Sequence, residues 1–199
     1  LRDEAMTIFL AGHETTANAL AWLMYLLSEN PDEVEKIANE VNEVLGERTP
    51  TAEDVRNLKY TSQAIEEGMR LYPPAWIFGR KSKDTDKLGE YEIPGGSDIM
   101  ICSYILQRSP EFWEDPEKFD PERFSEENSK ARPRYHYFPF GGGQRFCIGN
   151  NFAMMEMILI VAMVVQRFRL KLVPGHIVER NHLVTLRPKY GIKMTVHGA

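Results

Sequence analysis

The stretch Phe140–Asn150 reads FGGGQRFCIGN, with three consecutive glycines followed four residues later by Cys147. Glycine loses more backbone freedom on folding than any other residue type, so three in a row are costly. They are worth that cost only where the backbone must turn sharply or approach another group closely. Because Cys147 is one of only two cysteines in the chain, we expect the glycines to serve its sulfur.

The residues around Cys147 favour a charged sulfur. The segment after it, Asn150–Arg167, is apolar on nearly every side and predicts a buried helix. Free N–H groups at the start of such a helix carry partial positive charge and favour a thiolate over a thiol. Arg145 adds a cation that can pair with a nearby anion. A thiolate held in this way is either a nucleophile or a metal ligand.

Other interpretations of the two cysteines and the glycine run fit less well. A buried, inert thiol is the usual fate of a lone cysteine, and it suits Cys102, which lies on a predicted strand. It leaves the glycines before Cys147 unexplained. A Walker loop would end in Gly-Lys-Ser/Thr, and a dinucleotide fingerprint would need glycine where Phe146 stands, so both phosphate-binding patterns are excluded.

The overall composition is that of an ordinary globular protein. Of 199 residues, 43% are hydrophobic and 27% are charged, and the net charge of −5 gives no electrostatic footprint for nucleic acid. Two cysteines make no disulfide framework, so we expect a reducing, cytoplasmic location. The longest apolar run, Met157–Val165, is too short to cross a bilayer. The chain opens at Leu1 inside a helical pattern, and we expect it to be a piece of a longer protein.

Periodicity and turn residues predict a mainly helical chain with small β-sheets. We expect Asn30 to cap the second helix, Thr51 and Asp54 to form a capping box, and 112–134 to be irregular. The expected helices are 1–29, 31–45, a short one ending near 58, 60–72 and 150–167. The expected strands are 77–81, 91–93 and 98–102, with a closing hairpin of 183–186 and 192–196.

The first expected helix carries a polar patch, AGHETT, at Ala11–Thr16. A glycine inside a helix, here Gly12, costs about 1 kcal/mol relative to alanine, and Thr15 can bond back to a helix carbonyl. Either another group packs against this backbone, or a second helix packs closely at Gly12 and Thr15 is satisfied internally. A zinc motif is excluded, because Ala17 stands where the second histidine of His-Glu-x-x-His would be.

Four motifs together resemble the cytochrome P450 superfamily. Residues 140–149 match the haem-binding signature Phe-x-x-Gly-x-Arg-x-Cys-x-Gly, and AGHETT is similar to the oxygen-binding motif of the distal helix. Glu67 and Arg70 match Glu-x-x-Arg, and Pro121–Phe124 matches Pro-Glu-Arg-Phe. The resemblance covers 1–199 as one haem-binding region equivalent to the C-terminal half of the fold, with the N-terminal half absent.

The resemblance implies a role for each motif. Cys147 would be the axial thiolate ligand of haem b iron. Thr15 would contact dioxygen, and Glu14 would help to deliver protons. Glu67, Arg70 and Arg123 would form a buried structural network. The other residues implied to bind the cofactor are Phe140, Gly141, Arg145, Ile148, Gly149, Ala153, Ala11, Gly12 and Arg80.

The function that the resemblance implies is a haem-thiolate monooxygenase that inserts one atom of O₂ into an apolar organic substrate. Electrons would come from a flavodoxin-, ferredoxin- or reductase-type donor, for which Lys130, Arg132 and Arg134 offer a docking surface unless they are only a solvated loop. A second chain or a homodimer would supply the missing walls. The alternatives are a non-catalytic haem-binding module, a self-assembled fragment and an oxygen-independent isomerase, the last disfavoured by the Glu14–Thr15 pair.

Overall fold

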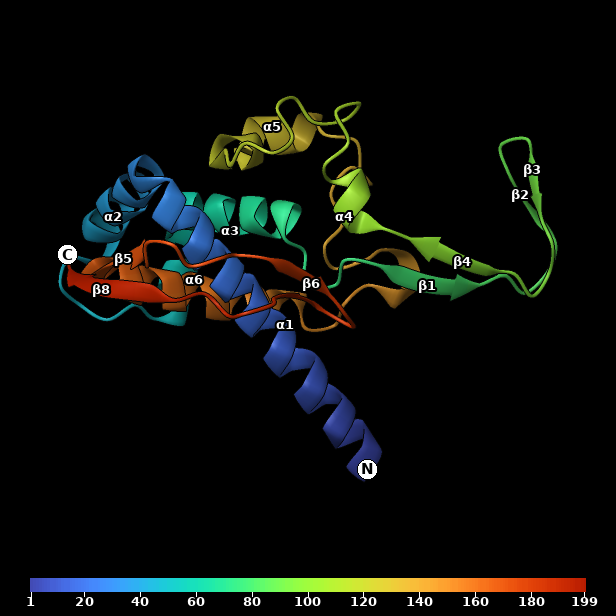
Figure 1. The fold of residues 1–199 in the computed structure, drawn as a ribbon, viewed down its shortest axis with the longest axis horizontal. Coiled ribbons are helices and arrows are strands. Elements are labelled where there is room, and N and C mark those ends of the chain that lie inside the picture. The colour runs from blue at the N-terminus through green and yellow to red at the C-terminus, as the bar shows by residue number, and fades with distance from the viewer.

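The computed structural model describes residues 1–199 and shows four main helices with small antiparallel sheets (Figure 1). The α-helices are α1 (Arg2–Glu29), α2 (Pro31–Leu45), α3 (Lys59–Leu71), α4 (Ser103–Leu106), α5 (Glu126–Ala131) and α6 (Asn150–Arg167). The 3-10 helices are η1 (Ala52–Asn57), η2 (Pro121–Phe124) and η3 (Gly143–Arg145). The strands are β1 (Phe78–Lys81), β2 (Asp86–Leu88), β3 (Tyr91–Ile93), β4 (Asp98–Ile101), β5 (Phe168–Leu172), β6 (Arg180–His182), β7 (Leu186–Pro188) and β8 (Met194–Gly198).

The core forms where α1, α2, α3 and α6 pack together. It contains eighteen buried apolar residues, and none of the α1 residues among them precedes Ala19. The crossing of α1 and α3 is close, because a Cβ added to Gly68 would lie 3.2 Å from Leu23 Cδ1. This close packing explains why a glycine stands in the middle of α3 at Gly68, although glycine is unfavourable within a helix. No helix combines the length and the unbroken hydrophobicity that a membrane crossing requires.

The start of η1 confirms the predicted capping box. The Asp54 carboxylate accepts from the Thr51 amide at 2.8 Å, and the Arg48 guanidinium donates to both of its oxygens at 2.6 Å. At the start of α2, Asn30 occupies the predicted cap position, but its side chain donates to the carbonyl of Leu26 in α1 at 2.8 Å. Asn30 therefore satisfies the end of one helix instead of the start of the next.

The strands pair differently from the predicted closing hairpin, which is wrong. β6 pairs with β7, and β8 pairs with β5, the strand that follows α6 directly. Residues 183–185 form the turn between β6 and β7 instead of a strand. The alternation of apolar and basic residues in Phe168–Leu172 is a period-two signal for β5 that the sequence interpretation overlooked.

Two further expectations are corrected by the structure. The segment 112–134 is not wholly irregular, because η2 and α5 lie within it, each with an N-cap side chain that accepts from the first turn: Asp120 for η2 and Ser125 for α5. Helix α6 is buried on one side only, since its core residues begin at Met157 whereas Phe152 is 66% exposed. The exposed start of α6 adjoins the cysteine loop.

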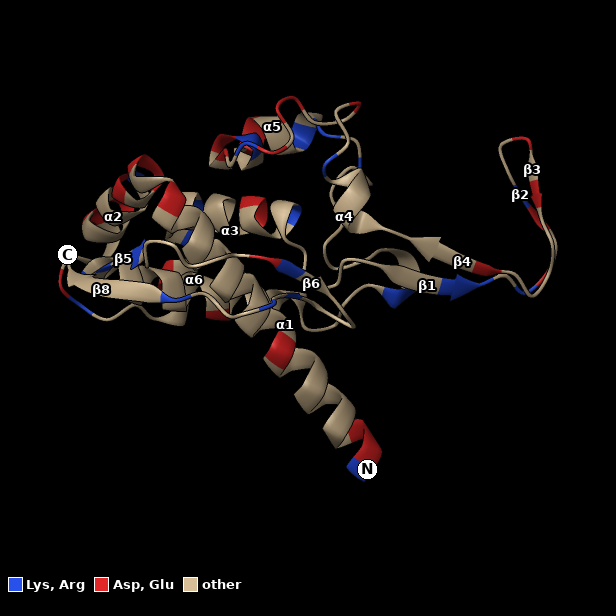
Figure 2. Ribbon diagram, in the orientation of Figure 1, with Lys and Arg blue, Asp and Glu red and all other residues tan.

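Two parts project from the body of the molecule in Figure 1. One is the β2–β3 hairpin, carried at the end of the β1–β4 pair. The other is the N-terminal half of α1, in which every residue up to Glu14 is exposed. Figure 2 shows this half with few charges, because residues 5–13 contain no Lys, Arg, Asp or Glu.

Candidate functional site

The conformation of the cysteine loop explains why glycine stands at each of the three positions 141–143. Gly141 and Gly143 have φ of 74° and 66°, the left-handed region in which a side chain is strained. A Cβ on Gly142 would lie only 2.9 Å from Cε1 of Tyr135. The Cys147 amide donates to the carbonyl of Phe140 at 3.0 Å, which closes the loop into a compact turn.

The thiol of Cys147 points out of this loop into the open. Cys147 is exposed and free, while Cys102 is half-buried. A side chain at Gly149 would lie 3.9 Å from Cys147 Sγ, so glycine there leaves the sulfur uncovered. The amides of Ile148 and Gly149 donate to no recorded acceptor. The expected N–H bonds to Sγ are not formed either, so these amides and the sulfur stay available to a ligand.

No three His, Cys, Asp or Glu side chains come together as a metal site. The protein would therefore offer a metal at Cys147 fewer than three such ligands, and the rest of the coordination shell would have to come from another molecule. That donor set fits an iron whose other ligands are the nitrogens of a macrocycle.

The surface beside the thiol fits the flat, apolar body of haem. Ile148 is 102% exposed, and Phe146 and Phe152 are also largely exposed. Phe140 packs against the core and lies 6.4 Å from Phe146 between ring centroids. Large apolar side chains gathered at a surface usually mark a binding site. This group, the apolar rim, is defined by Phe146, Ile148 and Phe152.

Two exposed arginines near this face have no acidic partner. Arg145 belongs to η3 within the loop and makes no recorded ion pair. Arg80 lies on β1 and donates only to the carbonyl of Gly79, at 2.8 Å. Strand β1 reaches the loop through Phe78, whose ring lies 3.9 Å from the Cβ position of Gly141. Cations of this kind can bind the carboxylates of a porphyrin.

The AGHETT segment lies on the exposed half of α1 and makes no recorded contact with the cysteine loop. A Cβ at Gly12 would meet nothing within 4 Å, so close helix packing does not explain this glycine. The Thr15 hydroxyl donates to the carbonyl of Ala11 at 2.7 Å, and Glu14 Oε1 accepts from the Thr185 hydroxyl at 2.7 Å. Ala11 is exposed, whereas Ala153 of α6 is half-buried.

A buried network lies behind the cysteine loop. Arg70 and Glu67 are fully buried, and their side chains are joined at 2.6 and 2.9 Å. Arg123 Nε lies 3.5 Å from Glu67 Oε1. The remaining Arg70 donors reach the carbonyls of Gln107, Pro116 and Lys118. The pair is therefore not the solvated surface contact that an isolated Glu-x-x-Arg would suggest.

Sequence reasoning overlooked Gln107 and missed the structural role of Arg132, which it had assigned to a docking surface or a solvated loop. Gln107 is fully buried, donates to the carbonyls of Met69 and Arg70, and accepts from the Phe138 amide at 3.1 Å, two residues before Phe140. No motif or periodicity marks a single glutamine of this kind. Arg132 lies over the rings of Trp113, Phe124 and Tyr137; its place in a basic, aromatic-rich stretch was a usable signal.

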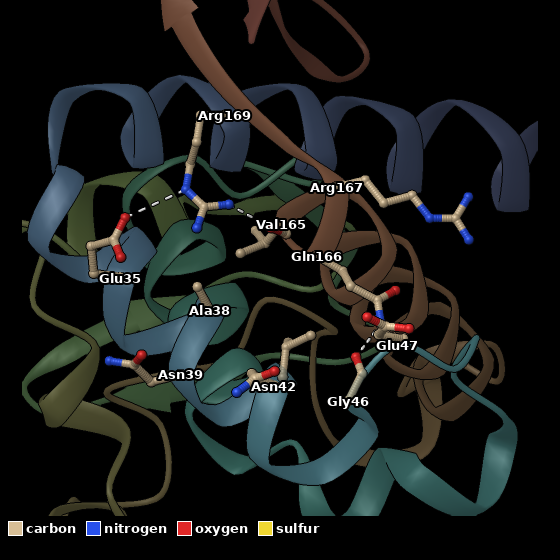
Figure 3. Close-up of a pocket in the computed structure, with 11 residues that line it drawn as sticks. Glu35, Ala38, Asn39, Asn42, Gly46, Glu47, Val165, Gln166, Arg167 and Arg169 are labelled. Atoms are coloured by element: carbon tan, nitrogen blue, oxygen red, sulfur yellow. Dashed lines mark hydrogen bonds and ion pairs between the residues drawn. The ribbon is translucent and has the colours of Figure 1, made fainter. Parts of the chain in front are cut away.

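The cleft in Figure 3 is separate from these residues. It has a volume of about 460 Å³ and lies between α2 and the junction of α6 with β5. Its lining is mixed in charge, with Arg169 facing Glu35 and Gln166 donating to the Gly46 carbonyl at 2.7 Å. It contains none of the predicted site residues.

Comparison with known proteins identifies relatives along nearly the whole chain. The model of the family described as Cytochrome P450 matches residues 1–196. A Mycobacterium tuberculosis protein named as a cytochrome P450 is 43% identical over 192 residues, covering 96% of this chain and 41% of that protein. Cyclooctatin synthase of Streptomyces melanosporofaciens is 44% identical, covering 88% and 38%. Carotene epsilon-monooxygenase of Arabidopsis thaliana is 40% identical, covering 98% and 37%. The chain thus spans about two fifths of the length of these relatives.

Proposed function

The chain belongs to the cytochrome P450 family, and from this premise we propose that residues 1–199 are a single haem-binding region equivalent to the C-terminal half of a haem-thiolate monooxygenase. The observation that carries the proposal is the exposed thiol of Cys147, held in a glycine-shaped loop beside the apolar rim and two unpaired arginines. A structural cysteine would be covered, and this one is open.

Haem b, when bound, supplies the activation of O₂ and the transfer of one oxygen atom to an organic substrate. The protein supplies binding and orientation. Cys147 would hold the haem iron through its sulfur, which the absence of a side chain at Gly149 leaves uncovered. Arg145 and Arg80 would bind the two carboxylates. The apolar rim, together with Phe140, Gly141 and Ala153, would pack against the cofactor and exclude water.

Ala11 and Gly12 would also lie against the cofactor, because neither presents a bulky side chain. Glu14 and Thr15 would manage protons, which the reduction of O₂ consumes. The proton of Thr15 Oγ1 is engaged by the carbonyl of Ala11, so its lone pairs are free to accept. Glu14 has one carboxylate oxygen engaged by Thr185, which leaves the other free to take a proton from solvent and pass it on.

The substrate would be apolar. The relative whose name specifies a carotene monooxygenase supports this class, as does the exposure of Leu183 and Val184 on the β6–β7 turn. Electrons would come from a flavodoxin-, ferredoxin- or reductase-type donor. Lys130 and Arg132 are poor candidates for docking that donor, because Lys130 pairs with Glu126 at 2.6 Å and Arg132 stacks on aromatic rings.

The test is the CO difference spectrum of the reduced protein in three forms. The wild type and Cys147→Ser are compared with Cys102→Ser, which uses the other cysteine as a matched control. We expect the thiolate signature to be lost in Cys147→Ser and kept in Cys102→Ser. A purified wild type without haem absorbance, or a Cys147→Ser variant with an unchanged signature, would overturn the proposal.

A further inference from the structure

The turn between β6 and β7 reaches back across the chain to the acid of the AGHETT segment. Thr185 in this turn is only 7% exposed. Its hydroxyl donates to Glu14 Oε1 at 2.7 Å and accepts from Asn18 Nδ2 at 3.2 Å. A side chain from the end of the sequence therefore bridges two residues one helical turn apart on α1.

The hydrogen bonds of Thr185 run in one direction, from Asn18 through the hydroxyl to Glu14. A threonine hydroxyl carries one proton, and the amide nitrogen of Asn18 can only donate, so the Thr185 proton is committed to Glu14 Oε1. A hydrogen bond to a carboxylate is short and strong compared with one between neutral groups. Glu14 is otherwise exposed, and no other side chain holds its carboxylate in one orientation.

The turn that carries Thr185 is itself fixed on both sides. The Leu186 amide donates to the carbonyl of Pro74 at 2.9 Å, and the Leu186 carbonyl accepts from the Trp22 indole at 3.1 Å. Leu186 and Trp22 are both almost fully buried. The Trp76 indole donates to the carbonyl of Leu183 at 2.8 Å. Thr185 is thus a rigid support and not a mobile surface hydroxyl.

We propose that Thr185 is a positioning residue that fixes the carboxylate of Glu14 through Oε1 and leaves Oε2 directed to the reaction. The inference rests on the proposed function, in which Glu14 carries protons. The same turn exposes Leu183 and Val184, so the residue that orients the acid is next to the side chains that would touch an apolar substrate.

The test replaces Thr185 with valine, which keeps the shape and removes the hydroxyl, and with serine, which restores the hydroxyl. Thr195→Val is the matched control, because Thr195 is an exposed threonine on β8 whose hydroxyl contacts only Lys171 and His197. The first measurement is the ¹³Cδ resonance of Glu14 in glutamate-labelled protein in the diamagnetic reduced, CO-bound state. It is assigned by its disappearance in Glu14→Gln.

We expect the Glu14 resonance to shift in Thr185→Val and to stay at the wild-type position in Thr185→Ser and Thr195→Val. The second measurement is product formed per NADPH consumed. This ratio should fall roughly threefold to tenfold in Thr185→Val, since only the position of the acid is lost, and serine should restore it. Asn18→Ala, which frees the same hydroxyl from its other partner, should give a smaller change in the same direction.

An unchanged Glu14 resonance in Thr185→Val, or a shifted resonance with unchanged coupling, overturns the inference. Neither result changes the CO difference spectrum that tests Cys147, so the proposed function and the role of Thr185 are tested by separate measurements. Conversely, loss of the haem proposal would leave the carboxylate resonance measurable in the same variants. Should Thr185→Val not fold, Asn18→Ala and Thr185→Ser still decide the question.

Discussion

The two sides of the cysteine loop differ in how completely their polar groups are satisfied. Behind the loop, all five N–H donors of Arg70 are committed, two to Glu67 and the others to main-chain carbonyls. In front of it, the side chains of Arg145 and Cys147 and the Ile148 amide have no recorded partner. The donors of Arg70 are therefore satisfied by the chain itself, whereas the front surface leaves polar groups open to a second molecule.

The largest expected effect comes from breaking the interior side. Arg70→Leu leaves Glu67 buried beside a single remaining cation, Arg123. It also removes the hydrogen bonds that Arg70 donates to three main-chain carbonyls. Breaking a buried pair in this way costs about 3–5 kcal/mol. Denaturant unfolding of Arg70→Leu is compared with Lys130→Ala, whose ion pair with Glu126 is largely exposed. Equal midpoints for the two variants would show that the network is not structural.

A smaller effect concerns Glu66, on α3 next to the network. Burial raises the pKa of Glu66 from 4.5 to about 7, and the Arg132 charge opposes the rise only in part. The folded protein therefore holds this proton more tightly than the unfolded chain, so the contribution to stability is full below about pH 4.5 and is lost as the pH rises through about 7.

Glu66→Gln should remove the loss of stability that the wild type shows as the pH rises through about 7. The variant should match the wild type near pH 5 and exceed its free energy of unfolding by roughly 1–3 kcal/mol at pH 8. Unfolding is measured across this range, with Glu43→Gln on the exposed side of α2 as the control. Persistence of the full pH slope in Glu66→Gln would assign it to another group.

The smallest expected effect on stability comes from two glycines within helices, Gly12 on the exposed half of α1 and Gly68 in α3, which is packed against α1. Gly12→Ala on the open half of α1 meets nothing within 4 Å and should stabilise the fold by up to about 1 kcal/mol. Gly68→Ala forces a Cβ to 3.2 Å from Leu23 and should destabilise it. Thermal melting checks both. If Gly12 faces the cofactor, its alanine variant should also lose turnover while gaining stability; a variant with unchanged turnover would contradict that role.

The sequence was most informative where local rules decide the structure. The bounds of α6 and the capping box of η1 follow from periodicity and from the side chains at the helix ends. The cysteine loop was identified because two of its glycines need left-handed backbone, which no other residue adopts easily. These features depend on neighbours within a few positions.

The missed features depend on distant partners. The pairing of β5 with β8 joins segments separated by the β6–β7 hairpin, and no local signal in either strand identifies so distant a partner. The side chains of Gln107 and Thr185 act through hydrogen bonds to residues far along the chain. A lone polar residue carries no periodic signal, so only three-dimensional placement reveals such roles.

Helix α1 connects the buried core to the exposed segment that carries Ala11 and Gly12. Its C-terminal half is held in the core at Trp22 and Leu23, and the same unbroken helix continues to Ala11 and Gly12, which are exposed in the half that projects from the body of the protein. At 1.5 Å per residue, Ala11 lies roughly 18 Å from the pivot at Leu23. A tilt of about 10° there would swing the distal motif by roughly 3 Å on that lever arm. Repacking of the interior at Gly68 or Leu23 would therefore move Ala11 and Gly12 without any change in their own side chains.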